Sequence, residues 1–240
     1  MACLEQGQFT TRCGVVDEIL HDVSTGNVTL TTCGPCQRHV LTGTTSTNYV
    51  DVRQGFKGTI VMRNLQMPNH NTDRSPLRLR GPETEANNFK PTTEVNLVLE
   101  GDNQIANTDL DCACIQVDAG ATLHISAVNP YDDYSGTLCL TSGGGAAIGS
   151  LNNHNPNEGQ GFTFSNLNNG RITTGGNVEI SSGVVYARGG HGAGIGGGHF
   201  YFYDGMILVR GGIVHCTANL HAAGIGSGCP TGIGVIYECT

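Results

Sequence analysis

A Gly-rich hexapeptide recurs three times in the second half of the chain, each time after a short strand-like run. Repeats of fixed period predict a solenoid, because a single unit cannot bury its apolar residues alone and must stack on its neighbours. The strand-like runs cover residues 137–140, 184–187 and 213–216. The copies are Gly-Ala-Ala-Ile-Gly-Ser at 145–150, Gly-Ala-Gly-Ile-Gly-Gly at 192–197 and Ala-Ala-Gly-Ile-Gly-Ser at 222–227.

A second strand precedes the last two copies, at residues 177–180 and 206–209. The unit is therefore strand, corner, strand and Gly-rich corner, and it advances by 29 residues from Gly183 to Gly212. One such unit can form one coil whose strands stack on the next coil at about 4.8 Å. We expect the isoleucine of each hexapeptide to point inward, and its glycines to supply the positive φ angles of tight corners.

The first half repeats the same rhythm more loosely, and two stretches interrupt it. Four prolines within residues 68–91 predict a loop that leaves the solenoid, and residues 152–161 predict a second. The sequence thus predicts one all-β domain, a single-stranded right-handed parallel β-helix (β-solenoid) over residues 27–240 with loop excursions. Residues 1–26 are expected to form a cap or an inter-subunit connector. Strands are expected at 27–31, 49–52, 58–62, 94–99, 114–117 and 121–125.

The hexapeptide and its preceding Ile/Val-rich strand resemble the Gly-Ala-Gly-Ile-Gly-Gly repeats of bacterial surface proteins. Those proteins are predicted to be right-handed parallel β-helices, and some are labelled carbohydrate-binding. The resemblance covers roughly residues 94–228. It implies the same architecture, and it implies a cell-surface carbohydrate-binding or adhesin module, with surface glycans as ligands, as an alternative function.

Charge and hydropathy exclude several partners and suggest a location. The formal net charge is −8 and the arginines form no basic stripe, which argues against nucleic acid. No segment is long and apolar enough to insert in a membrane, and residues 1–14 do not resemble a signal peptide. We expect an extracellular or spore-surface location reached without a recognisable signal, for example by lysis of the mother cell that builds a spore appendage.

The ten cysteines are even in number, which favours pairing in an oxidising compartment. Cys33-Gly34-Pro35-Cys36 has the residues of a thioredoxin-like redox motif, but no helical pattern follows it, so a structural disulfide or turn is expected. Together with Cys112 and Cys114 it also suggests a four-thiolate zinc site, although the one-residue gap suits a tetrahedron poorly. We therefore predict no metal and no cofactor. The structural disulfide candidates are Cys33, Cys36, Cys112, Cys114, Cys139 and Cys216.

Four further cysteines lie near the two ends of the chain, at Cys3, Cys13, Cys229 and Cys239. A linear solenoid places its ends at opposite poles, whereas bridged Cα atoms lie within about 7 Å. These cysteines are therefore candidates for intermolecular disulfides. Residues 232–240 read as a strand without a polar cap. An uncovered coil is an aggregation risk or an assembly surface, and the alternative is that the ends pair internally or fray. We predict a structural subunit that polymerises with itself head to tail; whether Lys57 or Lys90 forms a covalent crosslink stays open.

A glycoside hydrolase of the polygalacturonase type is the third hypothesis. Its motifs are matched in part by Asn107-Thr108-Asp109, Asp132-Asp133, Gly190-His191-Gly192 and residues 171–173. Their order is wrong and the basic motif lacks its lysine, so we predict that the chain is not an enzyme. The aromatic run at 200–203 is a candidate sugar-stacking face, with strand packing as the simpler explanation.

Overall fold

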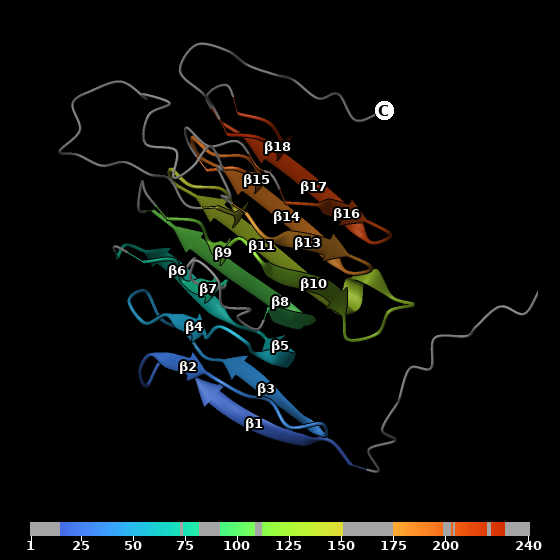
Figure 1. The fold of residues 1–240 in the computed structure, drawn as a ribbon. Coiled ribbons are helices and arrows are strands. Elements are labelled where there is room, and N and C mark those ends of the chain that lie inside the picture. The colour runs from blue at the N-terminus through green and yellow to red at the C-terminus, as the bar shows by residue number, and fades with distance from the viewer. Residues whose placement is uncertain are drawn as a thin grey trace, which may run out of the picture.

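The computed structural model describes residues 15–72, 74–81, 92–108, 112–150, 175–198, 203, 205–219 and 222–228. Within these ranges the protein is all-β, with long parallel sheets and one three-residue 3-10 helix, η1 (Asp133–Ser135). The strands form an 11-stranded sheet and a 7-stranded sheet, stacked from one end of the molecule to the other (Figure 1).

The 11-stranded sheet consists of two rows of parallel strands, which we name row A and row C. They are joined by β8 (Thr93–Asn107), whose first half belongs to row A and second half to row C. Row A also contains β1 (Asp17–Asp22), β3 (Gln37–Thr42), β5 (Lys57–Arg63), β10 (Ala121–Ala127), β13 (Asn177–Ile180) and β16 (Ile207–Val209). Row C also contains β6 (Gln66–His70), β11 (Gly136–Ser142), β14 (Val184–Gly189) and β17 (Ile213–Ala218).

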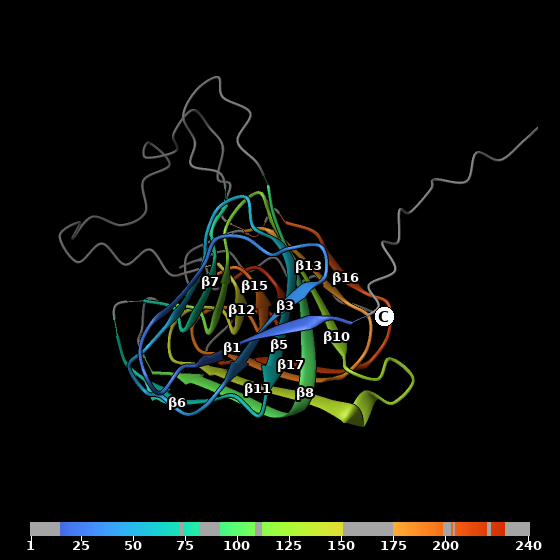
Figure 2. The same cartoon turned by 90° about the horizontal axis from the view of Figure 1, so that it is seen from below.

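The 7-stranded sheet is row B, and its strands are short. It contains β2 (Val28–Leu30), β4 (Val50–Val52), β7 (Leu77–Leu79), β9 (Ile115–Val117), β12 (Ile148–Gly149), β15 (Ile195–Gly196) and β18 (Ile225–Gly226). From β5 onward the chain passes through rows A, C and B in that order. Viewed along the stack, the three rows lie on different sides of a common core (Figure 2).

The register agrees with the expected repeat. Val184 pairs with Ile213, 29 positions further along the chain. In row B, Ile115, Ile148, Ile195 and Ile225 align across neighbouring strands, and the first three are fully buried. The isoleucine of the repeat therefore points into the core, as predicted. Alternation in the longer strands, such as the buried positions of β10, completes the apolar interior.

The Gly-rich segments differ from the prediction, because they are themselves strands rather than corners only. Gly149 and Gly196 pair with each other and have φ angles of 138° and 137°. A Cβ atom added at Gly149 would lie 2.0 Å from the Gly196 carbonyl oxygen. Glycine is thus required by the close approach of stacked backbones as well as by the positive φ.

The predicted loop at 68–91 is partly wrong. β6 begins before it and continues into it, and β7 lies inside it, paired with both β4 and β9. Leu77 and Leu79 are fully buried, so apolar alternation outweighs the nearby prolines. Pro68 is tolerated because β6 pairs only with β8 among the described strands and its register shifts there. Residues 82–91 and the second predicted loop at 152–161 lie outside the described residues.

The sheet also begins earlier than the expected boundary at Asn27. β1 pairs along its whole length with β3, although its sequence Asp-Glu-Ile-Leu-His-Asp has few apolar residues. Part of the segment 1–26 therefore belongs to row A. The reason lies in its ion pairs, described below, which substitute for apolar burial on its outer face.

Candidate functional site

The Cys-Gly-Pro-Cys motif forms a turn that leads into strand β3. The Gln37 amide donates to the Gly34 carbonyl, and the Cys33 thiol donates to the Gln37 carbonyl at 3.0 Å. Cys33 is a free thiol, whereas Cys36 is disulfide-bonded, so these two cysteines do not bridge each other. Because the motif leads into a strand, it lacks the helix N-terminus that activates a redox thiol.

Cys114, Cys139 and Cys216 are free thiols, and burial raises the pKa of each. Burial raises the pKa of Cys114 to about 12 and that of Cys216 to about 11. Cys139 aligns with Tyr186, which aligns with His215. Cys216 is therefore two strands and one residue away from Cys139, more than about 9 Å and beyond bridging distance. The predicted internal disulfides of Cys114, Cys139 and Cys216 are therefore wrong, since these three cysteines are free thiols.

The structure also does not bring these cysteines together as a four-thiolate zinc site. Cys33 precedes a row A strand, whereas Cys112 and Cys114 precede β9 in row B. In the described ranges, no group of three or more His, Cys, Asp or Glu side chains is arranged to hold a metal ion.

The hydrolase motifs are distributed over different corners. Asp132 accepts a hydrogen bond from the Tyr134 amide, and Asp133 accepts one from the Gly183 amide, at the corner between rows A and C. His191 follows β14, at the opposite end of row C. Six strand residues separate the two corners, which is about 20 Å. Asp109 and residues 171–173 lie outside the described residues, as do residues 200–202 of the aromatic run.

The last described coil, β16 to β18, leaves part of the apolar core uncovered. Ile180 in β13 is fully buried, but its register partner Val209 in β16 is 44% exposed. Val214 and Cys216 in β17 are likewise only partly buried. This pole of the stack, shown at the red end of Figure 1, therefore presents apolar side chains that the inner coils bury.

The strand edges at the two poles carry backbone groups directed away from the stack. In β16, the Met206 carbonyl and the Arg210 amide bond to β13, so the intervening Ile207 and Val209 amides point the other way. In β1, the Asp17 and Val23 amides point towards β3, so Glu18 and Leu20 have their amides on the open side. Among the described strands, β16 pairs only with β13 and β1 only with β3.

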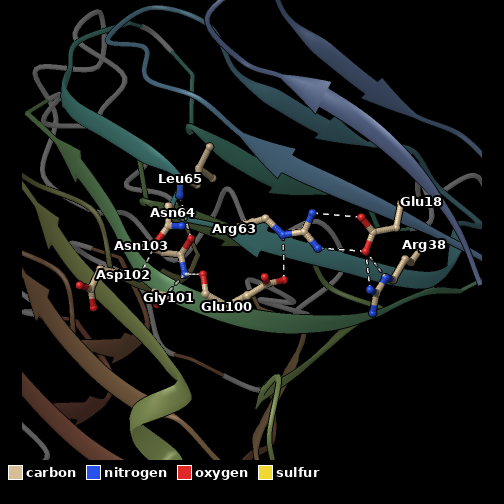
Figure 3. Close-up of polar contacts among 9 residues, drawn as sticks. All are labelled: Glu18, Arg38, Arg63, Asn64, Leu65, Glu100, Gly101, Asp102 and Asn103. Atoms are coloured by element: carbon tan, nitrogen blue, oxygen red, sulfur yellow. Dashed lines mark hydrogen bonds and ion pairs between the residues drawn. The ribbon is translucent and has the colours of Figure 1, made fainter.

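An ion-pair cluster fixes β1, the open strand at the first pole. Arg63 in β5 donates through Nη1 and Nη2 to both carboxylate oxygens of Glu18, at 3.0 and 2.9 Å, and through Nε to Glu100 at 2.9 Å (Figure 3). Arg38 in β3 also pairs with Glu18. The cluster therefore links four successive strands of row A across their outer face.

Asparagines build the adjoining corner between rows A and C. The Asn103 side-chain oxygen accepts from the Leu65 amide at 2.9 Å, and the Asn64 side-chain oxygen accepts from the Asp102 amide at 3.1 Å (Figure 3). Asn64 has a positive φ of 50°, which asparagine tolerates better than most residues. These bonds hold each corner over the one in the next coil.

The ion pairs of Glu18 should make the pairing of β1 sensitive to strong acid. Hydrogen bonds from Arg63 and then Arg38 lower the pKa of Glu18 to about 2, from 4.5. Its stabilising effect is then complete above pH 4.5 and disappears as the pH falls from 4.5 towards 2. We expect Glu18→Gln to lower amide protection in β1 at pH 7 and to match the wild type near pH 2. Asp17→Asn on the same strand is the control. Equal amide protection of β1 in Glu18→Gln and in the wild type at pH 7 would show that the Glu18 ion pairs do not stabilise this strand.

Sequence reasoning missed this cluster, because its members lie on strands that were not expected or far apart along the chain. The terminal cysteines Cys3, Cys13, Cys229 and Cys239, and residues 232–240, lie outside the described residues. No helix in the described part of the chain is long and apolar enough to cross a membrane.

No protein-family model matches this chain, and no curated protein or solved structure matches it significantly. Its function therefore has to follow from the geometry of the chain itself.

Proposed function

We propose that the chain is a structural subunit that polymerises head to tail by continuing its parallel sheets from one molecule to the next. The observation that carries this proposal is that the two ends of the stack have exposed apolar side chains and backbone amides directed outward. Val209 is 44% exposed at a position that the neighbouring coil buries, and the β16 and β1 edges each have amides directed away from the stack. Two different surfaces in contact give a heterologous junction, which repeats without closing.

The finer architecture belongs to the same proposal. Three rows visited in a fixed order, with parallel neighbours in each, are compatible with a single-stranded right-handed parallel β-helix, the hand that parallel crossovers strongly favour. Joining β16 of one subunit to β1 of the next would extend row A. Burying Val209 and its neighbours there would supply the apolar area that the last coil leaves exposed.

Intermolecular disulfides from those of Cys3, Cys13, Cys229 and Cys239 that are not bonded to Cys36 would lock such junctions in an oxidising extracellular or spore-surface setting. This part of the proposal rests on the sequence. A polymer held by the sheets alone would form without them, so the two contributions can be separated by a reductant.

The test is negative-stain electron microscopy of the purified chain, with gels run with and without reductant. We expect unbranched filaments, and ladders on the non-reducing gel that collapse to one band on reduction. A monomer that remains monomeric at high concentration under oxidising conditions would refute the proposal.

A binding module is the second candidate, and one corner favours it. Tyr131 and Tyr134 are 97% and 75% exposed, on a turn held by bonds from their amides to Asn129 and Asp132. Rigid exposed aromatic rings are suitable contacts for surface glycans. If filaments do not form, glycan binding that is lost in a Tyr131→Ala/Tyr134→Ala double variant would support this module instead.

A further inference from the structure

Two histidines from the neighbouring strands β1 and β3 pack together at the first end of the core. The ring of His21 in β1 stacks on that of His39 in β3, with centroids 5.1 Å apart and planes at 29°. His21 Nε2 lies 2.9 Å from His39 Nδ1, and His39 Nε2 lies 2.9 Å from the Thr32 carbonyl oxygen. His39 is 6% exposed and its other side faces the Phe56 ring at 5.8 Å.

These contacts determine where the protons lie in the neutral pair. A carbonyl oxygen only accepts, so His39 Nε2 carries a hydrogen and donates it to Thr32. The neutral ring then has a lone pair on Nδ1, and His21 must donate to it from Nε2. A first added proton can enter at His21 Nδ1 without breaking the pair. A second would place hydrogens on both facing nitrogens and would remove the bond that joins the rings.

Within the part of the chain that the structure describes, no carboxylate is positioned to neutralise those protons. The carboxylates of β1 near the pair are engaged elsewhere, Glu18 with Arg38 and Arg63 and Asp22 with the Ser24 amide. Asp17 starts the same strand, and Arg38 adjoins His39 on β3 and adds positive charge. On the preceding turn, Cys33 donates its thiol to a carbonyl. Within the described ranges, neither ring is in ion-pair contact with a carboxylate.

We propose that the His21–His39 pair makes the first coil an acid-sensitive end, which loosens in mild acid while the inner coils stay folded. β1 is the strand at risk because, among the described strands, it pairs only with β3. The inner strands are stabilised by apolar and ionic contacts with their neighbours. Among the described residues, no two histidines pair at the core positions of those strands.

The direction of the effect follows from the titration. Burial, and then the neighbouring His39, lower the pKa of His21 from 6.5. The folded first coil therefore favours the neutral ring, and its stabilisation is complete above pH 6.5. It is lost as the pH falls below 6.5 through the lowered value of the folded state. The loss begins as the pH falls below 6.5, whereas the loss of the Glu18 ion pairs begins only below pH 4.5.

The consequence for assembly rests on the proposed function, because β1 is one half of the proposed junction. An opened β1 would no longer present an ordered edge to β16 of the next subunit. The opening itself is a property of the single molecule, so the two ideas can fail separately.

The experiment is hydrogen exchange with mass spectrometry at pH 7.5 and 5.0, at protein concentrations low enough for the chain to be monomeric and with its disulfides intact. Protection factors divide out the intrinsic pH dependence of amide exchange. In the wild type we expect protection in β1 to be lower at pH 5.0 than at pH 7.5, while that of β10 is unchanged. His21→Phe keeps a ring against His39 and should remove the difference. His215→Phe, on the outer face against Tyr186, should keep it.

Constant β1 protection between the two pH values in the wild type, or an unchanged fall in His21→Phe, would overturn the proposal. Should His21→Phe perturb the fold, an NMR titration of the wild-type histidine rings decides instead. A His21 ring that titrates below pH 6.5 supports the pair, and titration of His21 at the ordinary value contradicts it. Filament formation at pH 7.5 is scored separately and depends on neither outcome.

Discussion

Replacing Val209 with proline should stop end-to-end polymerisation while leaving the monomer folded. The Val209 amide points away from β13, so proline removes a donor from the open edge and none from the internal ladder. Losing that bond and introducing the ring should cost the junction on the order of 1–3 kcal/mol, about tenfold to a hundredfold in its equilibrium constant. Average filament length in electron micrographs and sedimentation should fall accordingly.

Val209→Ala is the matched control, because it loses the same side chain but keeps the amide. It should weaken assembly less than proline does. The opposite pole offers a second block at Leu20, which is 65% exposed and has its amide on the open side of β1. Leu20→Pro, with Leu20→Ala as its control, should also stop filaments.

Mixing the two blocked subunits tests the head-to-tail geometry directly. Val209→Pro leaves the first pole intact and Leu20→Pro leaves the last pole intact, so an equimolar mixture should give dimers and no longer species. Each variant alone should remain a monomer. Filaments formed by either proline variant alone, or a mixture that stays monomeric while the wild type polymerises, would show that these edges are not the junction.

Substituting alanine for Gly149 should unfold the protein or come close to doing so. The added Cβ would lie 2.0 Å from the Gly196 carbonyl oxygen, at a φ of 138° that alanine strongly disfavours. The clash is with backbone in a stacked coil, so a flexible side chain cannot relieve it. We expect a loss of more than about 3 kcal/mol in the free energy of unfolding, measured by urea titration with circular dichroism.

Gly26→Ala is the control for this prediction, because a Cβ atom there meets nothing within 4 Å. Its unfolding midpoint should stay close to that of the wild type, within about 0.5 kcal/mol. A Gly149→Ala protein as stable as Gly26→Ala would mean that the coils do not approach each other as closely as the stacked register requires.

The sequence alone was sufficient for the repeat and for many of the local strands. The isoleucine that recurs in each Gly-rich hexapeptide predicted inward-facing residues in stacked coils, and Ile148 and Ile195 lie buried and paired as expected. This succeeded because alternation and glycine content express short-range sterics and burial, which each unit carries in its own residues. The same reasoning failed at β7, where counting prolines obscured the alternation of Leu77 and Leu79.

Contacts between coils were decided only by the tertiary structure. Arg63 and Glu18 are 45 positions apart, and His21 and His39 lie on two strands with little apolar pattern. Their pairing depends on which strand stacks on which, and in what register, and no local propensity encodes that. The free thiols of Cys139 and Cys216 show the same limit. The even number of cysteines suggested bridges. Cys139 and Cys216 lie two strands and one residue apart, however, and this register places them beyond bridging distance.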